Sequence, residues 1–287
     1  MRRVRGRKWH ALVAVAAAAW SGCSLTSLSG LSGGVDAEAD AGPVAEAGRN
    51  ETTTFDAARE DAQTAADGSA DAGPFCKRID AAFCEDFDDL AGAGRWSLSN
   101  VQLAAHGIDK LAFTSPPASL FATTQAMDAG ETAESYRSFD LKQPATSVAY
   151  AFDVRVDARS DRPFVVATGA LTASGTRYTV SVVLDASDTY VEEAIQGATS
   201  SYKDFALGIA IPLGQWKRFA VLAVRKVDGT YRISVTLDGV NVLDKDLTLW
   251  SGFASGTPSI RVGALYTAGP TSSAWAVRLD NVVLDVP

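Results

Sequence analysis

The sequence predicts an all-β fold for residues 75–287, and three observations point to it. Short runs rich in Val, Thr, Tyr and Phe are separated by Gly, Asp, Ser and Pro, as strands are separated by turns. Several runs alternate apolar and polar residues, which is the period of a strand with one buried face. No run keeps a helical period. A dozen or more strands at this spacing predict a two-sheet antiparallel jelly-roll sandwich.

The clearest strand spans residues 147–157. Its apolar face carries Val148, Tyr150, Phe152, Val154 and Val156. The run 231–237 alternates in the same way and lies between two Asp-Gly pairs, which are turn signals. The run 216–224 is apolar on both faces, and this pattern predicts a central strand.

Weaker patterns complete the predicted sandwich. Further strands are expected at 83–88, 110–114, 118–123, 163–171, 176–184, 188–195, 205–211, 240–246 and 258–266. The last strand spans 274–286, and its inward-facing register shifts between Leu279 and Val282. This shift predicts a β-bulge at Asp280 and Asn281.

Residues 1–22 have the layout of a secretory signal peptide. Five basic residues precede a short apolar stretch at 11–19, which is too short to span a bilayer. The ending Ser21-Gly22-Cys23 resembles the lipobox of bacterial lipoproteins, although that family usually has an aliphatic residue where Trp20 stands. The resemblance implies a lipid on Cys23 and anchoring at the bacterial outer membrane or cell surface. A free Cys23 thiol after ordinary cleavage is the alternative.

Residues 23–74 are predicted to form a disordered tether. From residue 24 the segment holds twelve Ala, ten Asp or Glu, seven Gly and one aromatic residue, Phe55. So few bulky apolar groups cannot offset the entropy of ordering the chain. The net charge is −8, and loss of the five basic signal residues would leave −13. This acidity argues against nucleic acid as a partner and leaves the lipid anchor as the expected membrane contact.

The two remaining cysteines, Cys76 and Cys84, lie eight positions apart where the sandwich begins. In an oxidising compartment they are well placed to pair. We expect a disulfide that ties the tether to the first strand. A zinc site is disfavoured, because two Cys and the distant His106 supply too few ligands at the wrong spacing.

Both ends of the predicted sandwich resemble concanavalin A-like lectin/glucanase jelly rolls. The segment 83–88 (Phe-Cys-Glu-Asp-Phe-Asp), followed by Trp96, is similar to their opening strand, and 278–284 (Arg-Leu-Asp-Asn-Val-Val-Leu) is similar to their closing strand. Residues 216–238 resemble the central hairpin of laminin-G-type members. The resemblance implies a structural calcium ion between the first and last strands. Its ligands would include Glu85, Asp88 and Asp280, completed by backbone carbonyls. A solvated acidic edge is the alternative.

No catalytic motif is present. The laminarinase-type branch of this fold carries Glu-x-Asp-x-Glu on one strand, and that pattern is missing here. Glu192 and Glu193 are adjacent and therefore face opposite sides of a strand, although either could pair with the distant Asp204. His106 lacks a Gly-x-Ser-x-Gly elbow and is expected in a turn. The sequence therefore predicts no enzyme.

Sugar-binding faces stack pyranose rings on aromatic side chains. The candidates, in or beside predicted loops, are Trp250, Tyr190, Tyr202 and Tyr266, with Trp250 the best platform. We expect a non-catalytic envelope domain that binds carbohydrate or another surface polymer. One alternative is a divergent glycoside hydrolase or polysaccharide lyase. The other is a structural or protein-interaction module without a sugar site, which the small residues Ala149 and Ala151 favour.

Overall fold

The computed structural model describes residues 74–88, 95–98, 102–251 and 253–287. The signal peptide, Cys23 and all of the tether except Pro74 lie outside this range, so the expectations about them stay predictions. Within the described residues, no helix is long and apolar enough to cross a membrane.

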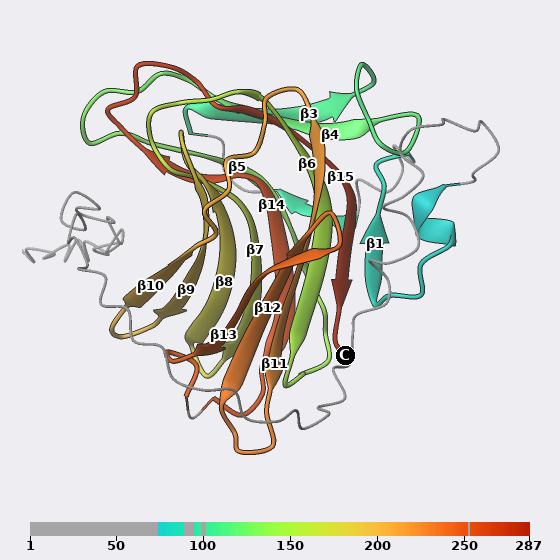
Figure 1. Cartoon of the computed structure of the whole chain (residues 1–287), viewed down its shortest axis with the longest axis vertical. Coiled ribbons are helices and arrows are strands. Elements are labelled where there is room, and N and C mark those ends of the chain that lie inside the picture. The colour runs from blue at the N-terminus through green and yellow to red at the C-terminus, as the bar shows by residue number, and fades with distance from the viewer. Residues whose placement is uncertain (1–73, 89–94, 99–101, 252) are drawn as a thin grey trace, which may run out of the picture. The chain divides into compact units, whose positions relative to one another are not determined.

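The described chain forms two antiparallel sheets packed face to face (Figure 1). The first sheet runs in the order β13 (Val240–Leu247), β12 (Tyr231–Leu237), β11 (Trp216–Arg225), β6 (Val148–Ala158), β15 (Ala276–Asp285), β4 (Ser119–Thr124) and β3 (Ala104–Asp109), with β1 (Phe83–Glu85) also paired to β15. The second runs in the order β10 (Ser201–Ala206), β9 (Thr189–Gln196), β8 (Thr176–Leu184), β7 (Phe164–Ala173), β14 (Thr257–Ala268), β5 (Thr132–Asp140) and β2 (Ser97–Leu98). The predicted jelly-roll sandwich is confirmed.

The core between the sheets follows the alternation in the sequence. All five apolar residues of β6 that were predicted to share a face are fully buried. Tyr150 on β6 reaches across the core, where its hydroxyl donates a hydrogen bond to the Val180 carbonyl of β8 at 2.9 Å. Gly169 on β7 leaves the room for this ring, because a Cβ there would lie 2.5 Å from Tyr150 Cδ1. The two sheets are therefore joined by a polar contact as well as by packing.

The outer face of the first sheet is partly covered by the N-terminal end of the described chain. The short 3-10 helix η2 (Phe75–Lys77) buries Phe75 in a small apolar cluster with Ala151 and Val283. The predicted disulfide between Cys76 and Cys84 is present and joins this helix to β1. Ala151 is thus covered by protein and does not floor a ligand face. In the sequence analysis, Ala149 and Ala151 favoured a structural module without a sugar site. The burial of Ala151 under the N-terminal segment removes its support for that alternative.

Some strand boundaries differ from the prediction. Residues 110–114 form a loop, because the Asp109 carboxylate accepts the Leu111 amide and turns the chain. The strand expected at 205–211 begins at Ser201 and ends at Ala206. Strands β2, β3 and β5 were not predicted. His106, expected in a turn, lies on β3 with its Nδ1 2.6 Å from Ser135 Oγ. The bulge at Asp280 and Asn281 is confirmed by a shift in the β15–β6 register.

Candidate functional site

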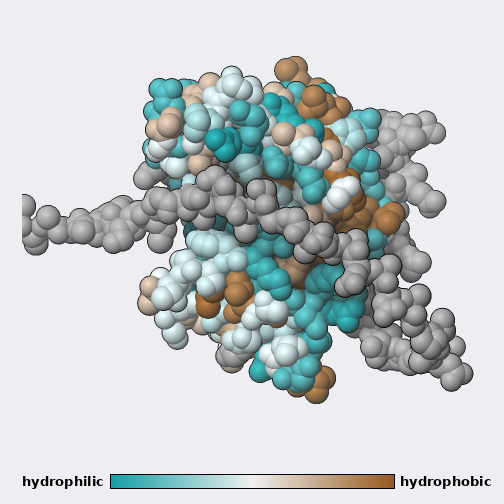
Figure 2. All heavy atoms as spheres, turned by 60° about the vertical axis from the view of Figure 1, so that its left-hand side comes forward, coloured by the Kyte–Doolittle hydropathy of each residue, from teal (hydrophilic) through white to brown (hydrophobic). Residues whose placement is uncertain are grey.

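The outer face of the second sheet carries most of the polar chemistry of the sandwich. On β8, the residues Tyr178, Val180 and Val182 pack into the core, so Arg177 and Ser181 point to the other side. Ser181 is buried although it points away from the core, which indicates that this face is recessed. Figure 2, which brings the left-hand side of Figure 1 forward, shows mainly hydrophilic side chains, with a few hydrophobic ones, on the described residues.

Strand register places six polar side chains in one row across this face. Each member is the direct cross-strand partner of the next, from β5 through β14, β7, β8 and β9 to β10: Ser138, Arg261, Thr168, Ser181, Glu192 and Asp204. At the centre of the row, Thr168 Oγ1 and Ser181 Oγ lie 2.9 Å apart in a buried hydrogen bond. Neighbouring strands are roughly 4.8 Å apart, so Arg261 and Glu192 are separated by roughly 14 Å, a few sugar rings.

Two basic residues lie on this face: Arg261 in the row, and Arg177 four positions before Ser181 on β8. The Arg261 guanidinium lies over the Tyr136 ring, 5.0 Å from its centroid. Burial, and then the nearby charge of Arg261, lower the pKa of Arg177 from 12.5 to about 10. Nη2 of Arg177 is buried and has no hydrogen-bond partner among the described residues. Two cations thus lie close enough for their charges to interact, and one of them, Arg177, has a hydrogen-bond donor without an acceptor among the described residues. Such an arrangement favours the binding of an anion.

Tyr136 connects these cations to a carboxylate. Burial is the largest cause that raises its pKa, a hydrogen bond with Glu134 acts in the same direction, and the charges of Arg261 and Arg177 oppose them. Tyr136 and Glu134 are two positions apart on β5 and therefore point to the same side of the sheet. The phenol is protonated at neutral pH and lies between a proton acceptor and two cations.

The opposite end of the row is acidic. Glu192 on β9 and Asp204 on β10 are direct cross-strand partners, with roughly 5 Å expected between their Cβ atoms. Burial, and then the charge of Asp204, raise the pKa of Glu192 to about 7. Tyr190, two residues before Glu192, has its own pKa raised by burial and then by both carboxylates. The sequence left a pairing of Glu192 with Asp204 open, and the register brings them together.

The predicted aromatic platforms separate into two groups. Tyr190, Tyr202 and Tyr266 lie on β9, β10 and β14 of the second sheet. Burial and then the neighbouring Tyr202 raise the pKa of Tyr266. Trp250 is fully buried and makes edge-on ring contacts with Tyr178 and Tyr231 at 6.0 and 5.1 Å. Its ring closes one end of the core and offers no surface to a sugar, so the prediction of Trp250 as a platform is wrong.

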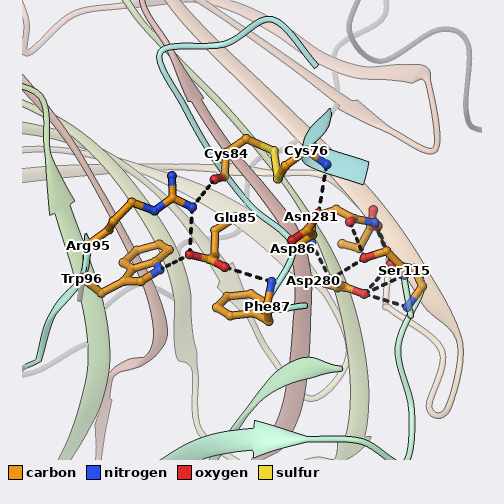
Figure 3. The surroundings of a disulfide bond; sticks show 12 residues. Cys76, Cys84, Glu85, Asp86, Phe87, Arg95, Trp96, Ser115, Asp280 and Asn281 are labelled. Carbon is orange, nitrogen blue, oxygen red and sulfur yellow. Dashed lines mark hydrogen bonds and ion pairs between the residues drawn. A yellow bond between two sulfur atoms is a disulfide. The ribbon is translucent and has the colours of Figure 1, made fainter. Parts of the chain in front are cut away.

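The residues predicted as calcium ligands lie near the disulfide, as Figure 3 shows for Glu85 and Asp280. Glu85 accepts hydrogen bonds from Trp96 Nε1 at 3.1 Å and from Arg95 Nη2 at 3.3 Å. Asp280 accepts the backbone amides of Thr114 and Ser115 at 2.8 and 2.9 Å.

Asp88, the third predicted ligand, has a pKa raised to about 6, chiefly by burial. In the described part of the chain, no group of three or more His, Cys, Asp or Glu side chains is placed to hold a metal ion. Glu85, Asp88 and Asp280 are therefore not brought together as a ligand set.

Sequence reasoning did not single out Arg177, Arg261, Tyr136 or Glu134. The available signal was the period-two polar pattern on buried strands: Arg177, Thr179 and Ser181 alternate with core residues on β8. The two arginines are far apart in sequence, and the register of β14, β7 and β8 is needed to place them on one face. That register could not be obtained from composition or spacing.

Comparison with solved structures shows the fold. An endo-β-1,4-glucuronan lyase from the fungus Trichoderma reesei matches with a TM-score of 0.58 and 14% identity, over 72% of this chain and 96% of that one. The cellulose-induced protein Cip1 matches with a TM-score of 0.51 and 10% identity, over 71% and 97%. The alginate lyase Aly36B matches with a TM-score of 0.47 and 14% identity, over 71% and 96%. No protein-family profile and no curated protein sequence matches the chain.

These findings contradict the expectation of a non-catalytic binding domain. The expected platform Trp250 is buried, the recessed face combines cations, a phenol and carboxylates, and the fold matches that of a polysaccharide lyase. They favour the enzymatic alternative that the sequence left open. The described chain has a jelly-roll fold shared with a glucuronan lyase and with Cip1.

Proposed function

We propose that this protein is a polysaccharide lyase that cleaves a uronate-containing polymer on the recessed face of the second sheet. The observation that carries the proposal is the pair Arg177 and Arg261 beside Tyr136, with Arg177 Nη2 buried and, within the described part of the chain, without a hydrogen-bond partner. A carboxylate bound between the two guanidiniums would satisfy that donor and offset the like charges. The fold shared with a glucuronan lyase supports the same class of reaction.

The reaction is a β-elimination at the uronate. The C5–H bond breaks, its electrons form a C4=C5 double bond, and the C4–O bond to the neighbouring sugar breaks. Arg177 and Arg261 hold the substrate carboxylate and stabilise the negative charge that develops beside C5.

Tyr136 carries the proton. Its oxygen takes the C5 proton as the phenol proton passes to Glu134, and the phenol then protonates the departing oxygen while Glu134 returns its proton. No proton is gained or lost overall, and no water is consumed.

The test is the ultraviolet absorbance of the unsaturated uronate that only a lyase forms. The full chain is incubated with glucuronan, alginate, pectate and gellan, and absorbance is measured together with new reducing ends. Tyr136→Phe and Arg261→Gln should each lower kcat/KM by about 100-fold or more. The matched control is Arg232→Gln on β12, whose guanidinium pairs with Asp244 on the other sheet.

Two outcomes contradict the proposal. Reducing ends without ultraviolet absorbance would identify a hydrolase, with Glu192 and Asp204 as the carboxylate pair. Full activity in both Tyr136→Phe and Arg261→Gln would place the chemistry elsewhere on the chain.

The location remains the one proposed from the sequence, an exported lipoprotein anchored through Cys23. The Cys76–Cys84 disulfide supports export, because disulfides persist in oxidising compartments. Metabolic labelling with a fatty acid tests the anchor: wild type should be labelled and Cys23→Ser should not. Equal labelling of the two proteins would contradict it.

A further inference from the structure

The recessed face carries opposite charges at its two ends, and this has a consequence for the substrate. The basic end, at Arg177 and Arg261, attracts a carboxylate. Glu192 lies in the same row as Arg261, on a strand roughly 14 Å from that of Arg261, with Asp204 beside it. A polymer with a carboxylate on every sugar would satisfy the first end and be repelled at the second.

Among the described residues, no cation is placed to neutralise the charges of Glu192 and Asp204. Lys203, the cation nearest in sequence, lies between Tyr202 and Asp204 and points to the opposite side of β10, where its Nζ contacts Thr248 Oγ1 at 3.2 Å. The charges that act on Glu192 and Tyr190 come from carboxylates and raise both pKa values, after burial, while the pKa of Asp204 is raised by burial. The acidic end therefore disfavours a further negative charge.

The same end has the groups that recognise an uncharged sugar. Tyr190 precedes Glu192 by two positions and Tyr202 precedes Asp204 by two, so all four side chains point to one side of the sheet. The Tyr202 side is open, with 38% of the residue exposed. Carboxylates accept hydrogen bonds from sugar hydroxyls, and phenol rings cover the apolar face of a pyranose.

We propose that Glu192 and Asp204 select the substrate, so that the recessed face takes a heteropolymer in which the uronate at Arg177 and Arg261 is separated from the next uronate by neutral sugars. A neutral ring lies over Glu192 and Asp204, flanked by Tyr190 and Tyr202. This inference rests on the proposed lyase function, and it makes homopolymers of uronate poor substrates.

The experiment compares two polymer classes on the full chain. Alginate carries a carboxylate on every sugar, and deacylated gellan carries one uronate among neutral sugars in each repeat. Binding to each is measured by affinity electrophoresis, and cleavage by absorbance of the unsaturated product. The variants are Glu192→Gln with Asp204→Asn together, and the control Asp244→Asn, which removes a carboxylate from the first sheet.

Wild type should prefer gellan over alginate in binding and in kcat/KM. The double variant should shift that ratio toward alginate by about tenfold or more, since two like charges are removed, whereas Asp244→Asn should leave it unchanged. Lowering the pH through about 7 should shift the ratio in the same direction in wild type, because Glu192 takes up a proton, and should have no such effect in the double variant.

The outcomes separate the two proposals. Equal preference in wild type, or a ratio that the double variant does not change, overturns the inference about Glu192 and Asp204 even if the protein is a lyase. Selective binding of gellan without unsaturated product overturns the lyase function and keeps the inference about selection. Failure to bind or cleave any uronate polymer overturns both.

Discussion

Replacing Arg177 by Met should stabilise the protein and abolish its activity. The charged guanidinium is half-buried on the outer face of β8, with Nη2 fully buried, and its pKa is lowered from 12.5 to about 10. That difference corresponds to an upper limit of about 3 kcal/mol against the charged folded form. The direction follows from linkage. A base whose folded-state pKa is lowered destabilises the fold at every pH below that value, hence at neutral pH.

The net gain should be smaller than this limit. Arg177 also has an attractive charge interaction with Asp140, which the substitution removes. Met keeps a similar unbranched apolar stem, so the strand loses little packing. We expect the free energy of unfolding to rise by roughly 1–2 kcal/mol, while kcat/KM on a uronate polymer falls by about 100-fold or more.

The assay is urea unfolding of the full chain at pH 7, followed by intrinsic fluorescence, beside the ultraviolet lyase assay. Arg232→Met on β12 removes an exposed, paired guanidinium and should change stability by less than about 0.5 kcal/mol. If Arg177→Met instead lowers stability by more than about 1 kcal/mol, Arg177 is held by structural partners. The interpretation of its guanidinium as an unsatisfied anion-binding group would then be wrong.

Three further predictions follow from single contacts. Gly169→Ala should lower the free energy of unfolding by about 1–3 kcal/mol in urea, because its Cβ would lie 2.5 Å from the fixed Tyr150 ring; an unchanged urea midpoint would show that the ring moves freely. The double variant Cys76→Ser with Cys84→Ser should be less stable by at most about 2.5 kcal/mol, since the closed loop is short, and reductant should then destabilise wild type alone. Stability should rise as the pH falls from about 8 to about 6, because burial raises the pKa of Glu192 to about 7 and the folded protein takes up a proton there; Glu192→Gln should remove part of this rise, and an identical pH profile would count against it.

The strands with a period-two pattern could be predicted from the sequence. The runs that became β6, β8 and β12 each alternate large apolar residues with smaller or polar ones, and each was predicted within about one residue of its ends. The paired cysteines were predicted for a similar local reason: eight positions between them at the entrance of a sandwich allow few other arrangements. These features depend on neighbours in sequence.

Strand β5 and the true extent of β10 could not be predicted in the same way. Strand β5 carries Glu134 and Arg137 with few β-branched residues, and β10 carries Tyr202, Lys203 and Asp204. Their polar character is typical of loops. Glu134, Tyr202 and Asp204 belong to the side of these strands that faces away from the core, whereas Arg137 and Lys203 lie on the other side, over the Phe87 and Phe205 rings.

Trp250 shows the opposite error. Its setting, Leu-Trp-Ser-Gly, is typical of a loop, and loop aromatics are good candidates for a sugar platform. The Leu249 amide, however, donates a hydrogen bond to the buried Glu193 carboxylate, which fixes the loop against β9. The next residue, Trp250, packs into the aromatic cluster with Tyr178 and Tyr231. Long-range contacts that the local sequence does not reveal therefore keep this ring away from solvent.

The residues of the candidate site come from several strands, so long-range pairing and not local sequence brings them together. A jelly-roll strand contributes only every second side chain to the recessed face, so no short motif can encode the site. Arg261 on β14 and Glu192 on β9 are joined through the buried pair Thr168 and Ser181 on the strands between them. The register of β7 against β8, to which this hydrogen bond contributes, keeps Arg261 and Glu192 in one row. A one-residue slip would turn the row into the core, so the selectivity proposed for Glu192 and Asp204 depends on the register of the sheet as well as on their charges.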